Sequence, residues 1–166
     1  MKIHDIMTRE PQCCGPETNL AAAAELMWSH DCGALPVVED GKLAGIVTDR
    51  DICIALGTRN RPAAELTVKD AATRDVQTCT PDDDIHTAMG IMRRAKIHRL
   101  PVVSDGGKLE GIVALNDLVL AAERKHGEID YEEVMNTMKA VSEHRAHHKP
   151  ATAETIKFPP IPVAVA

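Results

Sequence analysis

The sequence repeats itself once, and this repetition constrains the fold more than any other feature. Pro36 and Pro101 lie 65 residues apart in matching Leu-Pro-Val-Val strings. After one additional glycine in the second copy, Asp51 and Asp117 lie 66 residues apart in matching Gly-Ile-Val contexts. A repeat of this length is one supersecondary unit, which cannot bury its apolar face alone. We therefore expect two similar units that share a core.

Each unit has the same local pattern, strand, helix, strand, strand and helix. Apolar β-formers on either side of Asp-Gly turns predict hairpins, and Ala, Leu and Met at helical spacing predict helices. The predicted hairpin strands are 35–38 with 43–48 and 100–103 with 109–115, and the helices after them begin at Asp51 and Asp117. The pattern predicts an α/β (α+β) fold whose two repeats pack about a pseudo-twofold axis, followed by a C-terminal helix and a tail.

The register of the repeat also predicts the domain boundaries. Residues 1–60 form the first repeat, 61–67 the linker, 68–123 the second repeat, 124–146 the C-terminal helix and 147–166 a flexible tail.

Composition excludes several classes of protein. Aromatic residues make up 2% of the chain and the net charge is −6, so neither a base-stacking platform nor a basic phosphate-binding face is expected, and nucleic acid is an unlikely partner. No apolar stretch is long enough to cross a bilayer and no signal peptide is present, which predicts a cytoplasmic protein. The five cysteines, without a CxxC pair, are expected to be small buried hydrophobic residues. Trp28 is expected in the core or at a dimer interface.

The strings GALPVVEDGKLAGIVTDRDI and HRLPVVSDGGKLEGIVALNDL resemble the signature segments of cystathionine-β-synthase (CBS) domains. The resemblance covers about residues 1–123, and the whole chain is similar to stand-alone bacterial CBS-pair proteins. It implies a Bateman module, which is a disc with two clefts. In the family these clefts bind AMP, ADP, ATP, NAD or S-adenosylmethionine, and the disc commonly dimerises. We therefore expect a regulatory, signal-transducing or energy-sensing homodimer with an unknown downstream protein partner, not an enzyme, and no metal.

The resemblance assigns a ribose site to each repeat. In the family pattern Gly-h-h-Thr-x-x-Asp, where h is an apolar residue, the carboxylate accepts hydrogen bonds from the ribose hydroxyls, which suits a vicinal diol. In the first repeat Thr48 offers a hydroxyl, Arg50 offers charge and Asp51 is the carboxylate. In the second repeat Asp117 is retained beside Asn116, but alanine replaces the threonine, which weakens the expected phosphate contact.

A phosphate site is implied by His98 and Arg99. They resemble the His-Arg pair that grips nucleotide phosphates in the CBS subunits of AMP-activated kinases, and arginine binds phosphate through two parallel hydrogen bonds. The matching first-repeat residues, glycine and alanine, carry no charge. We expect two unequal sites whose phosphates point toward a shared centre near Arg99.

Base contacts are assigned to apolar positions around the first strand and the Leu-Pro strings. The resemblance nominates Pro11 and Ala34 in one repeat and Val76 in the other, and Pro36 and Pro101 complete the predicted site.

Other interpretations remain open on the sequence. Asp51 and Asp117 also suit simple helix starts, where the helix dipole favours a carboxylate. The clefts would be vestigial if the chain were an interaction scaffold that docks a partner through its C-terminal helix and tail. His98 with Asp117 would form the acid–base pair of an enzyme. Three histidines near the C-terminus have the spacing of metal ligands on one helix face, His144, His147 and His148.

Overall fold

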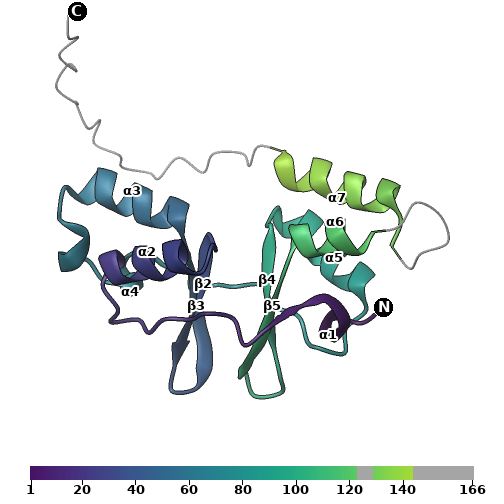
Figure 1. The fold of residues 1–166 in the computed structure, drawn as a ribbon, viewed down its shortest axis with the longest axis horizontal. Coiled ribbons are helices and arrows are strands. Elements are labelled where there is room, and N and C mark those ends of the chain that lie inside the picture. Colours follow the sequence, from purple (N-terminus) through teal and green to yellow (C-terminus); the bar gives the residue numbers. More distant parts are fainter. Residues whose placement is uncertain (123–128, 144–166) are drawn as a thin grey trace, which may run out of the picture.

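The computed structural model describes residues 1–122 and 129–143, and its two halves each combine one β-hairpin with covering helices (Figure 1). In chain order, the first half of the sequence contains α1 (Ile3–Ile6), β1 (Thr8–Arg9), α2 (Leu20–Ser29), β2 (Ala34–Glu39), β3 (Lys42–Thr48), α3 (Asp49–Arg59) and the short 3-10 helix η1 (Ala63–Glu65). The second contains α4 (Val68–Ala71), α5 (Ile85–Ala95), β4 (Arg99–Val103), β5 (Leu109–Ala114), α6 (Leu115–Ala121) and α7 (Tyr131–Ser142). The predicted mixed α/β fold of two tandem repeats is confirmed.

The two hairpins have the same register. Ala34 lies opposite Thr48 in β2 and β3, and Arg99 lies opposite Ala114 in β4 and β5. Each hairpin also has a bulge at the same place in its repeat, between Val37 and Val38 or between Val102 and Val103. The sequence repeat is therefore a structural repeat, residue for residue.

The additional glycine of the second copy lies in the turn between β4 and β5. Gly106 and Gly107 both have positive φ, 91° and 84°, which a side chain would disfavour. The carbonyl of Gly107 accepts a hydrogen bond of 2.9 Å from the amide of Leu43 at the start of β3. The glycine-rich turn of one hairpin is thus bonded to the other hairpin.

The described residues form two hydrophobic cores, one in each half. Both are aliphatic because the chain has few aromatic residues. The first core contains Cys14, Leu20, Ala23, Met27, Leu35, Val37, Val47, Ile52, Ala55, Leu66 and Val68. The second contains Ile3, Cys79, Ile85, Ala88, Met89, Met92, Leu100, Val102, Val113, Leu115, Leu118, Ile129, Val134 and Val141.

The segment that opens each repeat packs on the other repeat. Ile3 of α1 is fully buried in the second core, and β1 pairs with β5. In the opposite direction, Val68 of α4 is fully buried in the first core, and Thr73 bridges to Ile46 of β3. Figure 1 shows α1 beside the second hairpin and α4 beside the helices of the first half. The two repeats are therefore joined by exchanged arms as well as by their linker.

The exchange explains one glycine in each repeat. A side chain at Gly45 would place its Cβ 2.9 Å from the carbonyl oxygen of Thr73, and one at Gly111 would lie 2.8 Å from that of Thr8. These separations are too short for a Cβ, so the crossing arm needs glycine at this position of β3 and β5.

The leading strand expected in each repeat is reduced to a single bridge. Cys14 pairs in parallel with Val37, and Cys79 pairs in the same way with Val102. Proline follows within two residues of each cysteine and has no amide hydrogen with which to continue a ladder.

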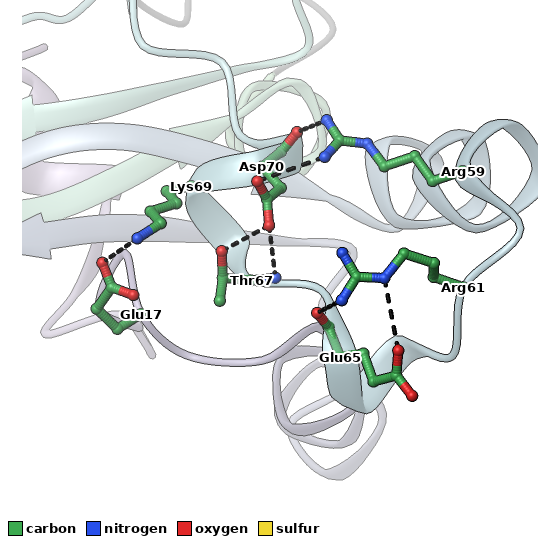
Figure 2. Close-up of polar contacts among 7 residues, drawn as sticks. All are labelled: Glu17, Arg59, Arg61, Glu65, Thr67, Lys69 and Asp70. Atoms are coloured by element: carbon green, nitrogen blue, oxygen red, sulfur yellow. Dashed lines mark hydrogen bonds and ion pairs between the residues drawn. The ribbon is translucent and has the colours of Figure 1, made fainter.

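Polar contacts hold the segment that joins the repeats (Figure 2). The guanidinium of Arg59 at the end of α3 bonds the backbone carbonyl of Asp70 and pairs with its carboxylate. Asp70 in turn accepts hydrogen bonds from the backbone and hydroxyl of Thr67, and Lys69 pairs with Glu17 at 2.6 Å. Residues 67–70 are thus anchored to Arg59 and Glu17 of the first repeat.

Helix α7 covers the helices of the second repeat. Three of its residues are buried, Val134, Thr137 and Val141, and α7 contacts both α5 and α6. No helix in the described ranges is long and apolar enough to cross a membrane.

Side-chain burial excludes one of the two places expected for Trp28, and the expectation that the cysteines are buried is wrong in part. Trp28 is 88% exposed on α2 and does not belong to the core. Of the cysteines, Cys14 and Cys79 are buried, whereas Cys13 and Cys53 are exposed. Burial raises the pKa of the Cys14 thiol to about 11 and that of Cys79 to about 12, with smaller contributions from Cys13 and from a nearby carboxylate.

Candidate functional site

The predicted ribose carboxylate of the first repeat lies in the first turn of α3. Thr48 is the N-cap residue, and its hydroxyl accepts a hydrogen bond of 3.2 Å from the amide of Asp51. Asp51 Oδ2 accepts bonds from the Thr48 amide at 2.9 Å and from its hydroxyl at 2.7 Å. This is a capping box in which both residues satisfy the helix start. Within the described part of the chain Oδ1 of Asp51 accepts no hydrogen bond, so one oxygen remains for a ligand.

The second repeat repeats this geometry without the hydroxyl. Ala114 has φ −115° and ψ 161°, nearly the values of Thr48, and its amide donates to Asp117 Oδ2 at 2.7 Å. The carboxylate is therefore in the same place at the start of α6. The side-chain hydroxyl that would serve a phosphate is missing.

Arg99 reaches from the second repeat to the first. Its Nη2 lies 3.3 Å from the point where a Cβ of Gly33 would stand, and Asp49 Oδ2 lies 3.1 Å from the same point. Gly33 directly precedes β2, and Asp49 directly follows Thr48. The guanidinium is therefore next to the first turn of α3, across the boundary between the repeats.

Gly33 and Asp49 were not among the predicted site residues. Gly33 is the counterpart of His98, and any side chain there would occupy the space between Arg99 and Asp49. The signal in the sequence is this asymmetry, glycine in one repeat where the other has the His-Arg pair. Because Gly33 has no side chain, the guanidinium of Arg99 from the second repeat has room beside it.

The remaining predicted residues differ in their burial. Ala34, Pro36 and Pro101 are buried in β2 and β4, whereas Arg50, His98 and Asn116 are exposed. Pro11 and Val76 are half-buried.

A small pocket of about 180 Å³ lies between the two hairpins, and Val76 lines it. Its other lining residues are Leu43, Ala44, Gly45, Arg74, Thr78, Val103 and Gly107. It contains apolar surface from both repeats and one cation, Arg74. Apolar lining with a few polar groups is usual for small-molecule pockets, but this pocket is smaller than their usual range of about 300–1,000 Å³.

A larger pocket of about 420 Å³ lies between α2 and α3. It is lined by Ala24, Met27, Trp28, Asp31, Cys32, Gly33, Asp49 and Ile52. It therefore extends from the Gly33–Asp49 region toward the helical face of the first repeat.

The structure offers no metal centre in the ranges 1–122 and 129–143, where no group of three or more His, Cys, Asp and Glu side chains is suitably placed. The three C-terminal histidines lie outside the described residues.

Comparison with known proteins agrees with the repeat. The profile of the CBS domain matches residues 3–58 and 68–124. The CBS domain-containing protein YhcV of Bacillus subtilis is 36% identical over 118 residues, which are 71% of this chain and 83% of YhcV. An inosine-5′-monophosphate dehydrogenase of Korarchaeum cryptofilum is 39% identical over 70% of this chain, but that match covers only 22% of the dehydrogenase.

A solved structure has a closely similar arrangement. The CBS domain pair of protein MJ0100, in complex with 5′-methylthioadenosine and S-adenosyl-L-methionine, superimposes with a TM-score of 0.67 at 29% identity. The match covers 72% of this chain and 94% of that chain.

Proposed function

The chain belongs to the CBS-domain family, and we propose that it is a regulatory module that binds an adenosine nucleotide of the AMP, ADP, ATP or NAD class. The observation that carries this proposal is the position of Arg99, whose guanidinium lies beside the first turn of α3 in the other repeat. A cation from one repeat and a ribose-binding carboxylate from the other then act on a single ligand.

The chemistry of the first turn of α3 supports this ligand class. Asp51 keeps one carboxylate oxygen for a ribose hydroxyl, while the amides that open α3 and its dipole favour an anion. Arg99 supplies two donors to a phosphate in a fixed planar fork. A nucleotide that joins ribose and phosphate satisfies both groups at once.

The second cleft is proposed to be the weaker one. Asp117 is present, but Ala114 has no hydroxyl, and the first-repeat counterpart of Arg99 is Ala34. A ligand at Asp117 would gain the ribose contact without the cation from the opposite repeat. The two sites should therefore differ in their affinity for phosphate.

The regulatory role is proposed in preference to catalysis. The matching segment of the inosine-5′-monophosphate dehydrogenase is about a fifth of that enzyme, so its activity does not transfer to this chain. We propose that the protein works as a cytoplasmic homodimer and signals to a downstream protein. Signalling requires that the nucleotide bind two states of the module with different affinities.

Calorimetric titration with AMP, ADP, ATP, NAD and S-adenosylmethionine tests the proposal. Asp51→Ala and Arg99→Ala should each abolish the tighter binding event. Asp70→Ala is the matched control, because Asp70 accepts the same backbone and hydroxyl hydrogen bonds from Thr67 at the start of α4, away from the cleft. It removes a capping carboxylate without touching the site.

A bound nucleotide should also raise the melting temperature. Ligand at 100 times its Kd contributes about 2.7 kcal/mol to the free energy of unfolding. Binding that survives Asp51→Ala and Arg99→Ala would place the nucleotide elsewhere. Absence of binding by all five ligands, in protein shown to be free of co-purified nucleotide, would refute the proposal.

A further inference from the structure

The pocket between α2 and α3 has an open aromatic and acidic wall. Trp28 stands at its edge with 88% of its surface exposed, an unusual state for the largest apolar side chain. Asp31 and Asp49 also line it, and among the described residues no lysine or arginine does. The surface therefore combines an exposed ring with two carboxylates.

The equivalent surface of the second repeat is covered by a later segment of the same chain. Shifted by 65 residues, Trp28 corresponds to Arg93 and Asp31 to Lys96. Arg93 donates a hydrogen bond of 3.2 Å to the hydroxyl of Thr137 in α7, and Lys96 pairs with Glu143 just after α7 at 2.8 Å. These two positions are thus the ones at which the second repeat holds its covering helix.

The first repeat has the opposite chemistry at the same positions. Lys96 pairs with the acidic Glu143, so Asp31 at the matching position should pair with a basic residue. Trp28 presents a flat apolar ring where Arg93 presents a hydrogen-bond donor. Exposed aromatic rings beside carboxylates suit proline-rich segments with a flanking lysine or arginine, because the polyproline II helix is stiff and loses little entropy on binding.

The chain contains one segment with this chemistry, Lys157-Phe-Pro-Pro-Ile-Pro162. Lys157 lies 14 residues after Glu143, which the ion pair with Lys96 fixes beside α5. Fourteen residues span up to about 46 Å when extended. Lys96 is only three residues before Arg99, whose Nη2 lies 3.3 Å from the Cβ position of Gly33 in the pocket wall. The C-terminal end of α7 is also its end nearer the first repeat (Figure 1), so the segment can reach the pocket.

We propose that the pocket between α2 and α3 binds residues 157–162 of the same chain. Trp28 packs against Pro159 and Pro162, and Asp31 with Asp49 pairs with Lys157. The first repeat is then covered by its own C-terminal segment, as the second is by α7. This inference does not depend on nucleotide binding.

Trp28 reports on the proposal directly, because it is the only tryptophan of the chain. In the full chain its fluorescence should be blue-shifted and weakly quenched by acrylamide. The double variant Pro159→Gly, Pro162→Gly should shift the emission to the red and raise the quenching constant severalfold. Pro150→Gly, in the same terminal segment, is the matched control and should leave both unchanged.

A charge exchange tests the ionic contact. Lys157→Asp should expose Trp28, and adding Asp31→Lys in the same chain should restore its shielding. Lys149→Asp, another lysine of the terminal segment, should have no effect.

Three outcomes would overturn the proposal. If acrylamide quenches the fluorescence of Trp28 as strongly in the unmodified full chain as in the proline variant, the pocket is uncovered. Trp28 that stays shielded in the proline variant would show a different cover. Shielding that disappears on dilution would show that a second copy of the protein covers the pocket.

Discussion

Truncation of Ile3 to alanine should destabilise the whole protein, although this residue lies next to the N-terminus. Ile3 is fully buried in the second core, which belongs to a repeat that begins some 65 residues later. The change removes three carbons at about 0.8 kcal/mol each and leaves a cavity. We expect a loss of about 3 kcal/mol in the free energy of unfolding, within the usual range of about 2–5 kcal/mol for such a change.

Urea denaturation and thermal melting measure this loss. For a chain of this size 3 kcal/mol lowers Tm by about 6–12 °C, and the m value should not change because the halves unfold together. Val68→Ala removes the symmetry-related contact in the first core and should cost about 2 kcal/mol, less than Ile3→Ala because it removes two carbons and not three. Ile54→Ala, at a residue 51% exposed on α3, is the control. A loss below about 0.5 kcal/mol for Ile3→Ala, the usual value for a surface site, would refute the exchange of arms.

Three further predictions concern stability and reactivity. Gly111→Ala should lower the free energy of unfolding by about 1–3 kcal/mol, because the new Cβ would lie 2.8 Å from the Thr8 carbonyl oxygen. Gly57→Ala is the control in α3, where a Cβ meets nothing within 4 Å and should be stabilising. Urea titration compares the two variants. Ala114→Thr should raise the free energy of unfolding by about 0.5–1 kcal/mol by completing the capping box of α6, and an unchanged denaturation midpoint would contradict this. Because raised pKa values keep them protonated, the thiols of Cys14 and Cys79 should resist a disulfide reagent at pH 8 in the native protein and react only after unfolding, while the exposed thiols react at once.

The hairpins and the helices after them follow from the sequence because their signals are local. Asp-Gly turns, alternating apolar residues and a carboxylate near each helix start fix these elements within a few residues. The linker is less regular, and α3 begins at Asp49, two residues before the predicted start at Asp51. The exchange of arms has no local signal, because Ile3 is equally apolar whichever core it enters.

The candidate site was predictable where it rests on a repeated pattern. Asp51 and Asp117 lie in the first turns of α3 and α6, as expected. Gly33 and Asp49 carry no local signal, because their importance depends on a side chain from the opposite repeat. Trp28 lies outside the core, which was one of the two places expected for it, and its alignment with Arg93 is a sign of this surface position.

The crossed arms also suggest how such a chain can arise. Two separate copies of one repeat that each lent an N-terminal arm to the other would form a domain-swapped dimer. Joining two such copies through residues 61–67 would turn that dimer into a single chain that keeps the exchanged contacts of Ile3 and Val68. In a single chain the two clefts can then differ, as they do here, where Arg99 lies beside the first and Ala114 takes the place of threonine in the second.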